Sequence, residues 1–163
     1  MTERVIDASI AVKWVMKGES HRAQARKLLR ESLSAGVRLI SPPLFENETE
    51  SVIQEQVYFR RVSVADADRA LRALEHVGVE IIYDPLLKDH ARKIARKCNQ
   101  QRVYDATYAA LAEIRGCEFW TADKYFYDAA KTVLPFLKHL PDYKYGKENK
   151  NRSVLKFKEG HRK

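Results

Sequence analysis

Residues 5–16 read VIDASIAVKWVM: two apolar residues, an aspartate, a short polar step and a second apolar run. The two leading residues predict a short buried strand that ends at Asp7. Ser9 is a suitable N-cap for a helix over Ile10–Met16, because its hydroxyl can accept a hydrogen bond from an amide of the first turn. An aspartate is unfavourable at such an apolar strand–helix junction, so Asp7 is the first candidate for a functional residue.

The alternation of apolar runs and turn signals continues along the chain. Further strands are expected over Val37–Ile40, Val79–Ile82, Cys117–Trp120 and within Thr132–Leu140. Further helices are expected over Ser20–Ser34, from Ser41 to Val57, after the capping box at Ser63–Asp66, from the N-cap signal Asp84-Pro85 to Cys98, and over Val103–Arg115. Pro135 places the last strand at a sheet edge. Strands alternating with helices indicate an α/β fold, a three-layer α/β/α sandwich with a mostly parallel central sheet.

Length and charge suggest one folded domain and a basic tail. The chain has 163 residues, enough for one domain, which we place at residues 1–142, with a tail over residues 143–163. Of the net charge of +8, the segment from Pro141 onward carries +5, from eight Lys or Arg against three acidic residues. A basic segment favours a polyanionic partner such as RNA. A merely solvated tail explains the charge equally well.

The N-terminal segment has early charges and no long apolar run, and nothing downstream approaches the length of a membrane span. Cys98 and Cys117 form no metal-type or redox-type spacing, so we expect reduced, structural thiols. These features predict a cytoplasmic protein without a membrane partner.

Four acidic residues are candidates for one site: Asp7, Glu48, Asp105 and Asp123. Each is expected near a strand end or on the first turn of a helix, and ligands in such folds gather at the carboxyl edge of the sheet. Clustered carboxylates repel one another unless a cation offsets their charge. Oxygen ligands suit Mg²⁺ or Mn²⁺, and the scattered histidines argue against zinc.

Each acid taken alone has an ordinary explanation. Asp105 could cap a helix and Asp123 could be a turn residue. Around Glu48, the neighbours Glu46 and Glu50 are equally acidic, and periodicity does not choose among the three.

Taken together, four segments resemble the PIN-domain nucleases, and more closely the VapC-like toxins of toxin–antitoxin pairs. The resemblance spans Val5 to about Leu140 and rests on four motifs: VIDASIAVKW (5–14), PPLFENE (42–48), VYDATYAALAE (103–113) and TADKYF (121–126). The second motif is similar to the family's P-x-L-x-x-x-E, which selects Glu48. The chain exceeds the length of a typical VapC toxin, and the basic tail matches nothing in the pattern.

The resemblance implies a PIN-like fold and metal-dependent hydrolysis of RNA phosphodiesters, with Asp7 and Asp105 as primary metal ligands and Glu48 and Asp123 completing the set. It also implies a homodimer and an antitoxin protein as a partner. Ser9 and Thr121 are expected to support the site, either by orienting a ligand or by packing and capping. Lys13 and Arg102 are weaker candidates for phosphate contacts; solvent-facing positions are the alternative.

Three other functions remain open from the sequence. A free-standing PIN nuclease in RNA processing would carry the same acids. A non-catalytic RNA-binding protein would be expected to have lost some of them, and all four are present. The third is a doubly wound phosphoryl-transfer protein, such as a receiver domain or a haloacid-dehalogenase-like phosphatase. The phosphatase needs D-x-D at its start, whereas this chain has Asp7-Ala8-Ser9.

Overall fold

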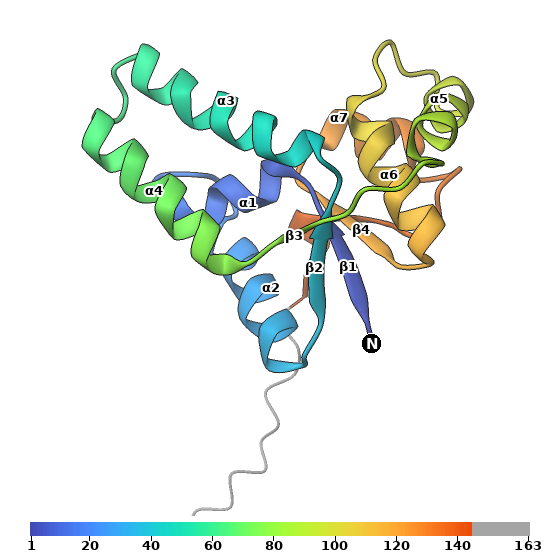
Figure 1. Cartoon of the computed structure of the whole chain (residues 1–163), viewed down its shortest axis with the longest axis horizontal. Coiled ribbons are helices and arrows are strands. Elements are labelled where there is room, and N and C mark those ends of the chain that lie inside the picture. Colours follow the sequence, from blue (N-terminus) through green and yellow to red (C-terminus); the bar gives the residue numbers. More distant parts are fainter. Residues whose placement is uncertain (145–163) are drawn as a thin grey trace, which may run out of the picture.

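Five strands form one sheet at the centre of the computed structural model, which describes residues 1–144 (Figure 1). In pairing order they are β3 (Glu80–Ile81), β2 (Arg38–Ser41), β1 (Glu3–Ile6), β4 (Glu118–Thr121) and β5 (Leu137–His139). Every neighbouring pair is parallel, with Val5 paired to Ile40 on one side and to Phe119 on the other. The carboxyl ends of all five strands therefore lie on the same edge of the sheet.

Helices cover both faces of the sheet, which confirms the predicted three-layer sandwich (Figure 1). One side carries α1 (Ala8–Val15), α2 (Arg22–Ser34), α3 (Leu44–Tyr58) and α4 (Val64–Val77). The other side carries α5 (Leu87–Lys97), α6 (Tyr104–Arg115) and α7 (Lys124–Ala130), and a 3₁₀ turn over Leu140–Asp142 follows β5. The hairpin of α3 and α4 packs on α1 and projects from the body as an arm.

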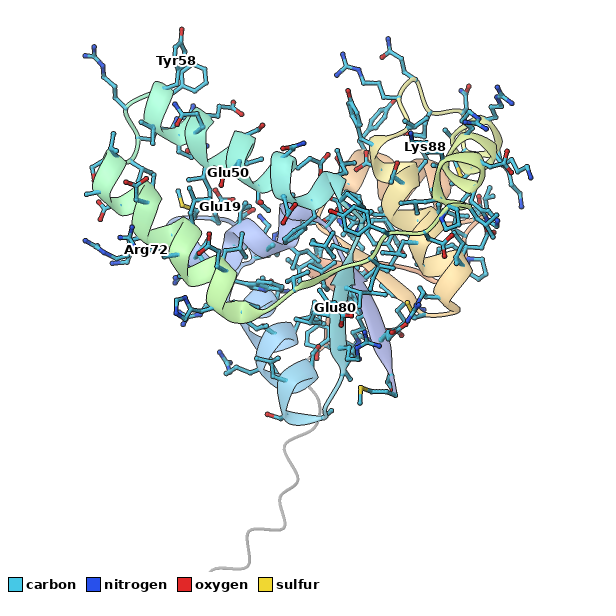
Figure 2. All side chains as sticks on the ribbon, viewed as in Figure 1. Glu19, Glu50, Tyr58, Arg72, Glu80 and Lys88 are labelled. Atoms are coloured by element: carbon cyan, nitrogen blue, oxygen red, sulfur yellow. The ribbon has the colours of Figure 1, made fainter. Side chains whose placement is uncertain are left out.

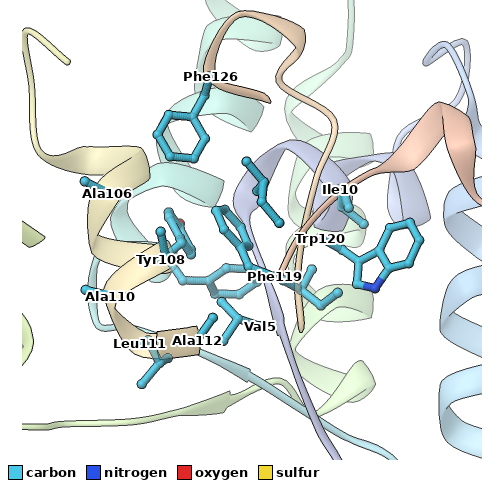
Figure 3. Packing of buried hydrophobic residues seen from close by; sticks show 14 of the residues in the cluster. Val5, Ile10, Ala106, Tyr108, Ala110, Leu111, Ala112, Phe119, Trp120 and Phe126 are labelled. Atoms are coloured by element: carbon cyan, nitrogen blue, oxygen red, sulfur yellow. The ribbon is translucent and has the colours of Figure 1, made fainter. Parts of the chain in front are cut away.

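One part of the core lies between the sheet and α6 and is rich in aromatic side chains (Figure 3). Tyr108 of α6 stacks on Phe119 of β4 with ring centroids 5.8 Å apart, and Phe119 contacts Phe126 at 6.2 Å. Burying rings of this size contributes several kcal/mol to folding, at about 25 cal/mol per Å². The core thus fixes α6, which carries Asp105, against the central strands.

The structure corrects several local predictions. α1 begins before Ser9, because the Asp7 carboxylate itself caps the helix by accepting a hydrogen bond from the Ile10 amide. α2 begins at Arg22 rather than at Ser20, and its residue Leu33 is 53% exposed. Asp84 accepts a bond from the Leu86 amide but is not the N-cap of α5, which begins two residues later than such a cap would place it. The capping box at Ser63 and the edge position of β5 are confirmed.

Most of the apolar residues after Asp7 belong to the core. Ile10 is fully buried, and Trp14 and Met16 are 5% and 6% exposed. The Trp14 indole donates to the carbonyl of Ala25, which ties α1 to α2.

An ion cluster at the amino ends of the strands joins three elements. Glu3 of β1, 9% exposed, accepts hydrogen bonds from Arg38 at 2.7 Å and from two nitrogens of Arg115 at 2.6 and 2.8 Å. The bond and charge of Arg115, with the charge of Arg38, hold the pKa of Glu3 below its usual value of 4.5.

We expect Glu3→Gln to destabilise the protein by about 1.5–3 kcal/mol at pH 7, because charge-assisted bonds would be lost. The lowered pKa means that this contribution is present above about pH 4.5 and is lost as the pH falls through the folded-state pKa. Urea unfolding at pH 7 and at pH 3 checks this, and an equal deficit at both values would contradict it.

The described chain ends on contacts with α2 and β4. Tyr143 donates a hydrogen bond to Glu31, and its ring meets Trp120 edge-on at 5.1 Å. The predicted basic tail lies outside the described residues from position 145 onward. Among residues 1–144, no helix has the length and apolar character needed to cross a membrane.

Candidate active site

The structure brings the four predicted acids together in one hollow of about 420 Å³ at the carboxyl edge of the sheet. Asp7 directly follows β1, Asp105 lies on the first turn of α6, and Asp123 follows β4. Glu48 lies on the second turn of α3, one turn later than expected. Four segments distant in sequence therefore present carboxylates to a common space.

Asp7 is the most buried of the four, with 3% of its surface exposed. One carboxylate oxygen accepts hydrogen bonds from the Ser9 hydroxyl at 2.5 Å and the Ile10 amide at 3.2 Å, and the other accepts from Thr121 at 2.5 Å. Burial raises the pKa of Asp7 to about 7, the hydroxyl bonds lower it, and the charge of Asp105 raises it further. Asp7 is thus held in one orientation by both predicted supporting residues.

The two hydroxyls also connect Asp7 to the segment that bears Asp123. Ser9 accepts a hydrogen bond from the Ala122 amide at 2.9 Å, and Thr121 accepts one from the Asp123 amide at 3.0 Å. Asp123 in turn caps α7 through a bond from the Phe126 amide at 2.9 Å. Each hydroxyl therefore donates to Asp7 and accepts from the backbone after β4, which fixes the relative positions of the two acids.

Glu48 is positioned by a residue that the sequence did not single out. The buried Tyr108 hydroxyl donates to a Glu48 carboxylate oxygen at 2.6 Å. Burial raises the pKa of Glu48, and the bond from Tyr108 opposes that rise. Burial and the charge of Glu48 raise the pKa of Tyr108 far above its usual value, so this phenol stays a proton donor. Tyr108 follows Asp105 by three residues on α6, and this spacing was the sequence signal that could have placed Tyr108 near the site.

Asp105 differs from the other three acids because its carboxylate makes no hydrogen bond or ion pair within the described residues 1–144. The N-cap of α6 is Val103, which excludes the capping explanation for Asp105. Burial raises the pKa of Asp105 to about 6, and the charges of Asp123 and Glu48 add to the rise. Its oxygens are the ones most available to a ligand.

The donor set fits a hard divalent cation by its chemistry. The acids that line the hollow offer oxygen ligands only, and their mutual repulsion is what a cation would offset. Among residues 1–144, no three histidine, cysteine, aspartate or glutamate side chains already stand close enough to hold an ion as they are. Three or more of these acids would therefore have to move their side chains to surround one cation.

Other candidates are separated from this hollow. Glu46 and Glu50, the alternatives to Glu48, line a different depression between α3 and α4. Lys13, 8% exposed, lies 3.4 Å from the Glu19 carboxylate, so a phosphate contact is not supported. Arg102 is exposed, which agrees with the predicted alternative that its side chain faces solvent.

The sequence matches the model of the PIN domain over residues 4–132, the stretch that contains all four acids. The chain belongs to the PIN-domain family. A curated relative, the VapC ribonuclease Mb0985 of Mycobacterium bovis, is 30% identical over 131 residues, which is 80% of this chain and 94% of the relative. Ribonuclease VapC9 of Mycobacterium tuberculosis matches to the same extent.

Solved structures of low identity share the PIN fold. PAE2754 from Pyrobaculum aerophilum aligns with a TM-score of 0.59 at 23% identity, covering 78% of this chain and 84% of that one. VapC20 from Mycobacterium tuberculosis, described as a toxin that cleaves the sarcin–ricin loop, aligns at 0.56 and 18%, covering 77% and 94%. VapBC2 from Rickettsia felis, bound to a promoter DNA fragment, aligns at 0.58 and 12%, covering 85% and 98%.

Proposed function

We propose that this PIN domain is a Mg²⁺- or Mn²⁺-dependent endoribonuclease of the VapC type, with Asp7, Glu48, Asp105 and Asp123 as its catalytic and metal-binding residues. The observation that carries the proposal is the convergence of the four carboxylates in one hollow at the carboxyl edge of the parallel sheet. Membership of the family and the two VapC ribonuclease relatives support RNA as the substrate.

The four acids have different roles at this site. Asp105 offers carboxylate oxygens that accept no hydrogen bond within residues 1–144, and Ser9 and Thr121 hold the Asp7 carboxylate in the same hollow. Glu48, oriented by Tyr108, faces the same hollow. When bound, a divalent cation would lower the pKa of a water molecule and supply positive charge at the scissile phosphate.

Removing and restoring metal tests the proposal. Purified protein incubated with structured and unstructured RNAs should cleave in Mg²⁺ or Mn²⁺, lose activity in chelator, and regain it when excess Mn²⁺ is returned. Cleavage that continues unchanged in chelator would contradict metal dependence. Binding of RNA without any cleavage would favour the alternative of a non-catalytic RNA-binding protein.

We further propose that the chain is the toxin of a toxin–antitoxin pair. The structural similarity to VapBC2 supports an antitoxin partner, and a free-standing PIN nuclease in RNA processing is the alternative. A small neighbouring gene whose product binds this protein and suppresses its ribonuclease activity would support the toxin. Absence of such a gene would favour the free-standing enzyme.

A homodimer is the oligomeric state that we propose. Ile10, Trp14 and Met16 do not support it because they are buried, but Tyr83, Leu86 and Tyr104 are 78%, 56% and 50% exposed and remain available to a second copy. Light scattering at tens of micromolar should give twice the mass of one chain, and a single-chain mass would overturn this proposal.

The basic segment after the folded domain should add RNA affinity without adding stability. Its charge predicts a salt-sensitive contribution, because each neutralised phosphate steepens the dependence of affinity on salt. Truncation after Lys144 keeps the Tyr143 contacts, so the melting temperature should stay within about 1 °C while the slope of log affinity against log salt flattens. A truncated protein that melts much lower would assign the segment a structural role.

A further inference from the structure

The arm of α3 and α4 ends in an exposed aromatic and basic turn formed by Tyr58, Phe59, Arg60 and Arg61, which we call the arm tip. Tyr58 is 76% exposed and Phe59 is 52% exposed, and Tyr58 projects from the outer end of α3 (Figure 2). The two rings meet edge-to-face with centroids 5.1 Å apart, and the Arg61 guanidinium lies 5.1 Å from the Phe59 centroid. Arg61 and Phe59 thus support each other, and the Tyr58 ring stays open to solvent.

Two backbone hydrogen bonds fix the turn of the arm tip. The Arg60 amide donates to the Val57 carbonyl at 2.9 Å, and the Arg61 amide donates to the Gln56 carbonyl at 2.9 Å, which is the Schellman pattern of a helix end. Arg60 occupies the left-handed position of this motif at φ 55°. The ends of α4 and α6 have Gly78 and Gly116 in the left-handed region, which glycine adopts without steric cost.

The guanidinium groups of the arm tip have no acidic partner in the described part of the chain. Neither Arg60 nor Arg61 forms an ion pair within residues 1–144, whereas Arg69 in the next helix is paired with Asp66 at 2.9 Å. Open rings beside unpaired guanidinium groups suit single-stranded nucleic acid, because bases stack on the rings while phosphates bind the cations. An apolar protein partner would use the rings but would leave both charges unmatched.

The helix α3 connects the arm tip to the hollow that contains the four carboxylates, which we call the carboxylate hollow. α3 contributes Glu48, Ser51 and Val52 to the hollow, and Tyr58 follows Glu48 by ten residues, about 15 Å at 1.5 Å per residue. A few nucleotides of extended single strand cover that distance.

We propose that the arm tip binds unpaired bases of an RNA strand whose scissile phosphate lies in the carboxylate hollow, so that the substrate is single-stranded on that side of the cut. The proposal rests on the proposed ribonuclease function for the position of the phosphate. Binding at the arm tip itself requires no catalysis and is measured separately.

The test is the affinity of the full chain for a fluorescein-labelled 12-nucleotide uridine RNA, measured by anisotropy in chelator at two salt concentrations. Tyr58→Ala should weaken binding about tenfold, and Tyr58→Phe, which keeps the ring, should stay within twofold of wild type. Arg60→Gly should weaken binding and flatten its salt dependence while melting at or above the wild-type temperature, because glycine relaxes the left-handed position. Arg72→Gln, an exposed arginine on α4, is the matched control and should change neither (Figure 2).

Wild-type affinity in both Tyr58→Ala and Arg60→Gly would overturn the proposal. So would an altered molecular mass of these variants by light scattering with unchanged RNA affinity, because the arm tip would then be a self-association surface. Cleavage of the same RNA by wild type in Mn²⁺ tests the ribonuclease function independently. Weakened binding in the variants with no cleavage by wild type would reject the ribonuclease function and leave the arm tip as a nucleic-acid site.

Discussion

Asp105→Asn should reduce RNA cleavage by about 10²–10³-fold or more, since a group that stabilises transition-state charge contributes on that scale. Asp105 has no hydrogen-bonding or capping role in the fold, because its carboxylate makes no hydrogen bond within residues 1–144 and the N-cap of α6 is Val103. The substitution should therefore reduce activity on this scale without unfolding the protein. Single-turnover cleavage rates of wild type and Asp105→Asn in Mn²⁺ measure the loss of activity. Circular dichroism on the same samples checks that the variant is folded.

Glu48→Gln and Glu50→Gln form a matched pair for the same assay. Both residues lie on α3, but only Glu48 lines the carboxylate hollow, whereas Glu50 lines the depression towards α4. We expect Glu48→Gln to lose activity and Glu50→Gln to keep it. Equal rates in the Asp105→Asn variant and wild type, or equal losses in the two glutamine variants, would refute the assignment of the site.

The second large effect is the response of thermal stability to metal. A cation that binds only the folded state stabilises it by RT ln(1 + [L]/Kd), about 2.7 kcal/mol at 100 Kd. Mn²⁺ should therefore raise the wild-type melting temperature by roughly 5–10 °C for a domain of this size. Asp105→Asn should show little of this rise.

The same series in chelator measures the cost of the unoccupied carboxylate cluster. The pKa of Asp105 is raised to about 6, so at pH 8 it is ionised in a partly buried position near Glu48 and Asp123, at a cost to stability. Asp105→Asn should then melt at or above wild type at pH 8. The difference should shrink as the pH falls below about 6, where folded wild type takes up the proton. A variant that melts lower in chelator, with both proteins indifferent to Mn²⁺, would make Asp105 an ordinary structural acid.

Local patterns predicted most of the fold because the central strands are buried under helices on both faces and therefore consist of apolar residues. Val5 and Ile6 are apolar because they are fully enclosed between helical layers, and this is visible in sequence. Pro135 placed the last strand at the edge, and β5 is the edge strand. The seven-residue helix α7 was not predicted, because it is too short for a periodic apolar pattern.

The candidate site was accessible to sequence reasoning only in part. The motif around Pro42 selected Glu48 over its neighbours, and the geometry agrees, since Glu48 alone of the three lines the hollow with Asp7. The support of Glu48 by Tyr108 was missed because the two residues are 60 positions apart. Ser9 was assigned both to a helix cap and to the support of the site. The cap is Asp7 instead, and the Ser9 hydroxyl donates to the Asp7 carboxylate.

The central claim is that the four carboxylates form one cation site, and calorimetric titration with Mn²⁺ tests it most directly. The account predicts that wild type and Glu50→Gln bind the ion with the same affinity, while Asp7→Asn and Asp105→Asn bind it at least about tenfold more weakly. Binding of equal strength in all four proteins, or no binding to wild type at millimolar Mn²⁺, would contradict the account.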